Sequence, residues 1–226
     1  MENQKPLTQA QIEHEIRAAE MAGKPADFRG KIISNFFLLE KEIGIGLDLE
    51  DSTTLGSISL GGTTIGGDLN LKNAQIRGAF YMGESKIWGN LNFSYAKVSG
   101  VLNLVGSKIN GSLNFQGLEL NGFLSLAKAQ ISGNLDFRNI IISNSEYEGL
   151  TIVGDLYLNQ AIVQGGIDLT QALIEGNLDL SVICVQNSVD LTSTNIGNLL
   201  LLKDALIKGN LILKDTKYKK MIKHFL

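Results

Sequence analysis

Residues that could support catalysis or metal binding are few in this sequence, and they do not cluster. The single cysteine, Cys184, has no histidine close to it in the sequence, although a thiol needs a neighbouring base or cation to act as a nucleophile. The two histidines, His14 and His224, lie near opposite ends of the chain and so argue against a clustered metal site. We therefore predict no catalytic residues, no cofactor and no metal, and expect a protein that is not an enzyme.

Acidic side chains are the remaining candidates, since paired carboxylates can do acid–base chemistry or bind a cation. Asp168 and Asp190 are 22 residues apart and should stack on one side of a repeating structure, as should Asp136 and Asp179 on another side, with Tyr157 between them. Residues 139–202 hold seven acids and no Lys, Arg or His, whereas seven lysines follow from Lys203 onward. A solvated face explains the carboxylates more simply than a catalytic pair. The predicted acidic surface consists of Glu146, Glu148, Asp155, Asp168, Glu175, Asp179 and Asp190.

The elements that must position these groups follow a repeat of 11 residues, built from units of five and six. A Gly-x-Leu segment marks the repeat at Gly89, Gly111, Gly133, Gly154, Gly176 and Gly209. Spacings of five and six would smear the apolar residues around a helix of 3.6 residues per turn, whereas alternation in short strands puts them on one face. We therefore expect a coil that stacks on itself, with glycine or small polar residues at its corners.

The segment Ala26-Asp27-Phe28-Arg29-Gly30 matches the motif of the pentapeptide-repeat proteins: a small residue, Asp or Asn, Leu or Phe, a polar residue and often Gly. The resemblance spans about residues 26–218 and implies an all-β solenoid, a right-handed quadrilateral β-helix. A strict square of five-residue sides would have about 20 residues per coil. The alternating units of this chain predict 22 residues per coil and roughly nine coils.

Three segments are expected: a capping helix in residues 1–23, the β-helix in residues 24–216, and a capping or dimerisation segment in residues 217–226. Thr8 and Gln11 resemble a capping box, which predicts a helix over residues 8–22. At the other end a short helix is expected if the tail docks, because four apolar residues follow i, i+3, i+4, i+7 spacing. These residues are Tyr218, Met221, Ile222 and Phe225.

One interruption breaks the repeat. The spacing from Ile142 to Ile152 is ten residues rather than eleven, which predicts a one-residue deletion that would kink the stack or release a small loop. Residues 143–151 are then either a tolerated irregularity at a corner or a recognition loop.

Several residues predicted to point outward are apolar. On one side of the coil the outward position reads Gln75, Lys97, Glu119, Ile141, Ile162, Cys184 and Leu206, so its last four residues would form a continuous apolar stripe. Leu199, Leu201 and Ile212 are also predicted to point outward near the C-terminal end, and a contiguous apolar stripe usually marks an interface. The family resemblance adds dimerisation through the C-terminal end, so we expect a homodimer there; the alternative is that the tail folds back over its own last coil.

The composition narrows the functional classes. A net charge of -3 excludes a strongly basic nucleic-acid binder, and no apolar run approaches the length of a membrane span. The polar first residues and the single cysteine favour a cytoplasmic protein with no direct nucleic-acid or membrane contact. The favoured function is a non-enzymatic protein-binding or scaffold solenoid that acts through its lateral faces. The alternative follows from the resemblance: gyrase-protecting members of the family resemble duplex DNA in width and negative surface, which implies a DNA-mimicking regulator of type II topoisomerase.

Overall fold

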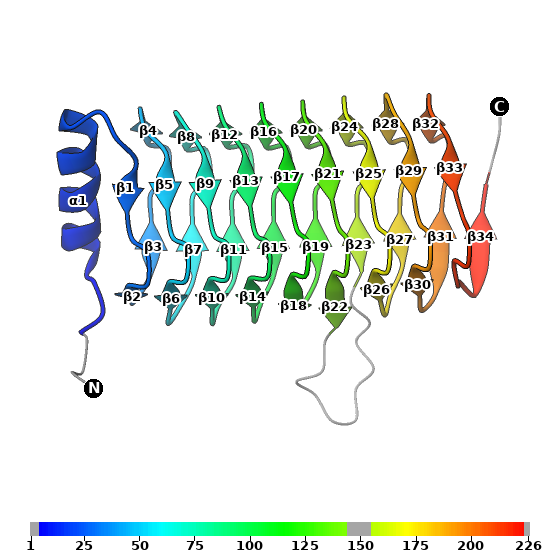
Figure 1. The fold of residues 1–226 in the computed structure, drawn as a ribbon, viewed down its shortest axis with the longest axis horizontal. Coiled ribbons are helices and arrows are strands. Elements are labelled where there is room, and N and C mark those ends of the chain that lie inside the picture. Colours follow the sequence, from blue (N-terminus) through cyan, green and yellow to red (C-terminus); the bar gives the residue numbers. More distant parts are fainter. Residues whose placement is uncertain (1–4, 144–154, 224–226) are drawn as a thin grey trace.

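The chain folds into a parallel β-solenoid with a helix at its N-terminal end (Figure 1). The structure is a computed structural model that describes residues 5–143 and 155–223. Within these residues there are one α-helix and 34 short strands, and each coil contributes one strand to each of four parallel sheets. The expected all-β solenoid with four sides and an N-terminal helix is thus confirmed.

We number the four sheets I to IV in the order in which the chain passes through them. Sheet I contains β1 (Ala26–Asp27), β5 (Leu47–Asp48), β9 (Leu69–Asn70), β13 (Leu91–Asn92), β17 (Leu113–Asn114), β21 (Leu135–Asp136), β25 (Ile167–Asp168), β29 (Val189–Asp190) and β33 (Leu211–Ile212). Sheet II contains β2 (Ile32–Ile33), β6 (Thr53–Thr54), β10 (Gln75–Ile76), β14 (Lys97–Val98), β18 (Glu119–Asn121), β22 (Ile141–Ser143), β26 (Leu173–Ile174) and β30 (Asn195–Ile196).

Sheets III and IV complete the coil. Sheet III contains β3 (Phe36–Phe37), β7 (Ile58–Ser59), β11 (Phe80–Tyr81), β15 (Leu102–Asn103), β19 (Leu124–Ser125), β23 (Leu156–Tyr157), β27 (Leu178–Asp179), β31 (Leu199–Leu201) and β34 (Lys220–Ile222). Sheet IV contains β4 (Glu42–Ile43), β8 (Thr64–Ile65), β12 (Lys86–Ile87), β16 (Lys108–Ile109), β20 (Gln130–Ile131), β24 (Ile162–Val163), β28 (Cys184–Val185) and β32 (Leu206–Ile207).

The pairing register confirms a coil of 22 residues through most of the rod. Leu91 of β13 pairs with Leu113 of β17, and the same interval recurs in all four sheets. Within each strand one side chain points into the rod and its neighbour points out, so the interior fills with stacked apolar residues. The predicted stack of aromatic rings is present: the ring of Phe115 lies 5.4 Å from that of Phe93 and 5.1 Å from that of Phe137, centroid to centroid.

Two kinds of corner turn the chain, and they need glycine for different reasons. At the corner that follows each strand of sheets I and III, one residue adopts a left-handed backbone, as at Gly106 (φ 69°) and Val182 (φ 57°). At the other corner successive coils come so close that a Cβ on Gly111 would lie 2.6 Å from the carbonyl oxygen of Gly89. A glycine of the first kind supplies backbone freedom, and one of the second kind supplies space.

The predicted one-residue deletion is wrong. Leu124 of β19 pairs with Leu156 of β23, an interval of 32 residues, so the chain between β22 and β23 is ten residues longer than the repeat requires. The two halves of each coil carry the same pattern of five and six residues, so a surplus of ten residues looks like a deficit of one when only the spacing is known. The possible recognition loop lies outside the described residues, apart from Ser143 in β22.

The two predicted terminal helices have different outcomes. Helix α1 (Gln9–Met21) begins with the expected capping box, in which Thr8 and Gln11 each accept a hydrogen bond from the other's backbone, and it buries Ile12 and Ile16 against the first coil. The predicted C-terminal helix is wrong. Residues Lys220–Ile222 form strand β34, which pairs with β31 and accepts a hydrogen bond of 2.9 Å from the amide of Leu202 at the carbonyl of Ile222. A free sheet edge offers this short tail backbone partners that an isolated turn of helix lacks.

Candidate interaction surfaces

The most regular polar feature is a column of outward-facing side chains on sheet I. One oxygen of each accepts a hydrogen bond from the backbone amide two residues further on, as between Asn92 and Ser94 (3.0 Å) or Asp190 and Thr192 (2.8 Å). Asp and Asn are suited to this position because their short side chains satisfy a backbone donor at the start of the turn. The column consists of Asp27, Asp48, Asn70, Asn92, Asn114, Asp136, Asp168 and Asp190.

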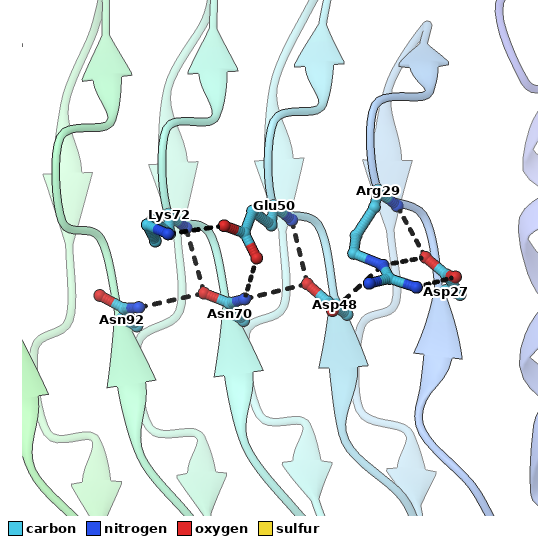
Figure 2. A network of polar contacts seen from close by, with 7 residues as sticks. All are labelled: Asp27, Arg29, Asp48, Glu50, Asn70, Lys72 and Asn92. Carbon is cyan, nitrogen blue, oxygen red and sulfur yellow. Dashed lines mark hydrogen bonds and ion pairs between the residues drawn. The ribbon is translucent and has the colours of Figure 1, made fainter.

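The N-terminal part of this column belongs to a network of ion pairs and hydrogen bonds (Figure 2). Arg29 Nη2 lies 2.8 Å from Asp27 Oδ2, and its Nε lies 3.5 Å from Asp48 Oδ2. The side-chain hydrogen bonds from Arg29, helped by its backbone amide, lower the pKa of Asp27 to about 2. Further along, Asn70 Nδ2 donates to Asp48 Oδ1 at 3.0 Å. The polar atoms of this network are therefore largely occupied by one another.

A shallow groove of about 750 Å³ runs beside the same column. Amides, carboxylates and a hydroxyl line it, and many of them already bind neighbouring coils: Asp68 Oδ1 accepts from the amide of Asn90 at 2.6 Å, and Asn90 Oδ1 accepts from the amide of Ser112 at 2.8 Å. These contacts tie successive coils together. The groove-lining side chains include no cysteine, histidine or lysine, so the groove lacks the usual nucleophiles and proton carriers.

The predicted acidic surface is spread over several faces. Asp168 pairs with Asp190 in sheet I, as expected, but Asp136 joins the same column, whereas Asp179 lies in sheet III beside Tyr157. The expected stack of Asp136, Tyr157 and Asp179 is thus wrong, because the ten extra residues shift the register between them. Of the other acids, Asp155 and Glu175 flank strands of sheet III, and Glu146 and Glu148 lie outside the described residues.

Two of the remaining carboxylates have strong partners. Arg138 Nε lies 3.7 Å from Asp168 Oδ2, and the same guanidinium binds Asp136. Asp155 Oδ2 accepts a hydrogen bond of 2.6 Å from the hydroxyl of Tyr157, which raises the pKa of Tyr157 to about 12. These contacts reduce the negative charge that the acidic stretch presents.

The predicted apolar stripe is shorter than expected. Ile141 lies in sheet II, whereas Ile162, Cys184 and Leu206 occupy successive strands of sheet IV. A continuous stripe of four is therefore wrong, again because of the extra residues between β22 and β23. We call the three residues in sheet IV the sheet IV stripe; Ile162 is 44% exposed, Leu206 is 54% exposed and Cys184 is partly buried.

The other predicted interface residues lie at the C-terminal end of the rod. Leu199 and Leu201 of β31 and Met221 and Ile222 of β34 are half-buried, whereas Ile212 and Tyr218 are exposed. Phe225 lies outside the described residues. The structure thus places these predicted residues around the last coil, next to the end of the sheet IV stripe.

Sequence reasoning missed the inward-facing residues of the last coil. Ala205, Ile207, Leu211 and Leu213 occupy core positions, yet each is only partly buried. The signal that could have revealed them is the difference between the two ends of the sequence, since a capping-box helix precedes the first coil and only a short lysine-rich tail follows the last.

Comparisons with known proteins add no assignment: the chain matches no family model, no curated protein and no solved structure. In the part of the chain that the structure describes, no helix is both long and apolar enough to cross a bilayer. No three His, Cys, Asp or Glu side chains gather there as metal ligands would.

Proposed function

We propose that this protein is a non-enzymatic binding protein, a solenoid that carries partner proteins on its surface, with its main contact region in the C-terminal coils. The observation that carries the proposal is the sheet IV stripe, which continues to the exposed core residues of the last coil. Contiguous apolar surface of this kind is uncommon on monomeric proteins unless it is an interface. The resemblance to pentapeptide-repeat proteins supports a scaffold role, and the expected homodimer would use the same region.

A site-specific photocrosslinker tests this proposal. Placed at Leu206 in the cells that make the protein, it should form a covalent adduct with a second copy or with another protein, identified by mass spectrometry. The matched control is Gln130, which occupies the equivalent outward position in β20 of the same sheet and lies among polar residues. The proposal fails if position 206 forms no adduct, or if both positions form the same adducts to the same extent.

A second proposal is the DNA-mimicking regulator of type II topoisomerase. One feature supports it, the column of Asp136, Asp168 and Asp190 on sheet I, whose carboxylates repeat once per coil. Arg138 neutralises part of this column, so the charge is far below that of a DNA strand. A supercoiling assay with DNA gyrase decides the point: inhibition or protection is expected, and charge reversal of Asp168 and Asp190 should abolish it. Unchanged supercoiling in the presence of the unmodified protein contradicts DNA mimicry.

A further inference from the structure

The last coil leaves backbone hydrogen-bonding groups without partners. In the coil before it, the amides of Val189 and Leu191 donate to the carbonyls of the next coil, each at 2.9 Å. The residues one coil further on are Leu211 and Leu213, and within the described residues their amides donate to no backbone carbonyl. The C-terminal edge of sheet I is therefore open.

Sheet IV ends in the same way, with free acceptors instead of free donors. The carbonyls of Ile183 and Val185 accept from Leu206 and Lys208, at 2.8 and 2.9 Å. One coil further on, the carbonyls of Ala205 and Ile207 accept no backbone hydrogen bond from any described residue. The end of the rod thus offers donors along one side and acceptors along another, which is what an added strand requires.

The same residues expose part of the core. Val189 and Leu191 are fully buried, because the last coil covers them, whereas Leu211 and Leu213 are only partly buried. An occupant must therefore supply apolar side chains as well as backbone hydrogen bonds. A bilayer would cover the apolar residues but leave the backbone groups unsatisfied, so a protein strand fits this surface better than a membrane does.

Charge identifies the kind of strand. Residues 203–223 contain seven lysines and two aspartates. Five of these lysines form no salt bridge with any described residue, in contrast to Lys72 and Lys97, which pair with glutamates one coil away; the five are Lys203, Lys208, Lys214, Lys217 and Lys220. Two copies joined end to end about a two-fold axis would bring these lysines together, and that like-charge contact is unfavourable.

We infer that the C-terminal end of the solenoid binds an extended acidic segment of a different protein, which adds strands to the open edges of sheets I and IV. Its alternate apolar side chains cover Leu211 and Leu213, and its carboxylates meet the surrounding lysines. This inference deepens the proposed binding function and rests on it, because it names the chemistry of the partner at the same end of the rod.

A peptide-display selection on the purified full-length protein tests the inference, with a random 12-residue library as the probe. The enriched peptides should carry Asp or Glu at alternate positions between Val, Ile or Thr. Binding should weaken by about tenfold or more in the double variant Lys203→Glu and Lys214→Glu, because both lysines border the open end. The matched control, Lys41→Glu with Lys108→Glu, makes the same charge change in coils nearer the N-terminus and should bind as the unmodified protein does.

Amide exchange followed by NMR gives a second readout that does not depend on a variant folding. An enriched peptide should slow exchange at the amides of Leu211 and Leu213 and leave those of the first coils unchanged. The inference is overturned if no peptide is enriched, if the enriched peptides are not acidic, or if Lys203→Glu with Lys214→Glu leaves binding unchanged.

Two further results would overturn the inference without touching the proposed function. A dimeric mass by light scattering, with Leu211 and Leu213 protected in the absence of peptide, would show that a second copy fills the end. Sedimentation with phosphatidylserine vesicles, lost in the lysine variant, would assign the end to a membrane. The proposed binding function fails separately, through the absence of a crosslink at position 206.

Discussion

The two ends of the solenoid are finished in different ways. At the N-terminal end, helix α1 covers the first coil, and its side chains satisfy the strand edges: Gln9 Nε2 donates to the carbonyl of Phe37 at 2.6 Å, and Glu20 Oε1 accepts from the amide of Gly44 at 3.1 Å. At the C-terminal end, the amides of Leu211 and Leu213 have no such partner among the described residues. Since stacked coils need a cap at each end, the difference indicates that the chain supplies one cap and a partner supplies the other.

The largest expected effect compares the interior with the open end. Phe115→Ala removes a fully buried ring stacked between two others and should lower the free energy of unfolding by about 3–5 kcal/mol. Leu213→Ala removes a side chain that is already partly exposed and should cost about 1 kcal/mol. Urea denaturation of the two variants measures both values. Equal losses would show that the last coil is as well covered as the middle of the rod.

A smaller effect is expected from the polar contacts of the N-terminal cap. Gln9→Ala removes both hydrogen bonds that its side chain makes to the edge of β3, and should cost about 1–2 kcal/mol. Lys220→Ala, in the outermost strand of the other end, should change the stability very little, because this side chain is exposed and forms no ion pair with a described residue. Thermal unfolding of the two variants compares them. A loss at Lys220 as large as the loss at Gln9 would contradict the difference between the ends.

The C-terminal coils also contain a strained corner that can be relaxed. Val182 is β-branched and adopts a left-handed backbone (φ 57°), at the corner where Gly106 stands three coils earlier in the rod. Val182→Gly should therefore stabilise the protein by about 1 kcal/mol, whereas Gly106→Val should destabilise it by about 1–2 kcal/mol. Denaturation midpoints test the pair. Destabilisation by Val182→Gly would mean that the exposed valine makes contacts outweighing the backbone strain.

The smallest expected effect is a pH dependence at the N-terminal end. The pKa of Asp27 is lowered to about 2 in the folded protein, and an unfolded aspartate titrates near 3.9. Its contribution to stability is therefore present above about pH 4 and is lost as the pH falls towards 2. Asp27→Asn should thus be less stable than the unmodified protein at pH 7, with the difference shrinking by pH 2. The effect should be small, because the carboxylate is exposed. A difference that stays constant with pH would rule out this ion pair as its source.

The sequence predicts the local structure well, because each part of it depends on neighbouring residues. The spacing of Phe93, Phe115 and Phe137 establishes the 22-residue coil, and Thr8 with Gln11 establishes the start of the helix. The position of Ile141 relative to Ile162 could not be obtained in the same way. Both halves of the coil look alike in sequence, so only the pairing in space shows that these residues lie on different sheets.

The C-terminal end was mispredicted for a related reason. The spacing of Tyr218, Met221 and Ile222 fits a helical face, but the free edge of β31 decides the outcome, because it offers hydrogen bonds to an extended chain. The partial exposure of Leu211 and Leu213 likewise depends on what does not follow them in space. Periodicity identifies core positions but does not reveal whether a further coil covers them.

Residue-resolved hydrogen exchange of the free protein tests the central claim, the difference between the two ends, most directly. The amides of Phe37 and Gly44 should exchange slowly, because side chains of the N-terminal cap bind them. The amides of Val189 and Leu191 should also be slow, since they bond to the last coil, whereas those of Leu211 and Leu213 should exchange at rates close to those of an unfolded chain. If Leu211 and Leu213 exchange as slowly as Val189 and Leu191, the C-terminal end is already covered and the account is wrong.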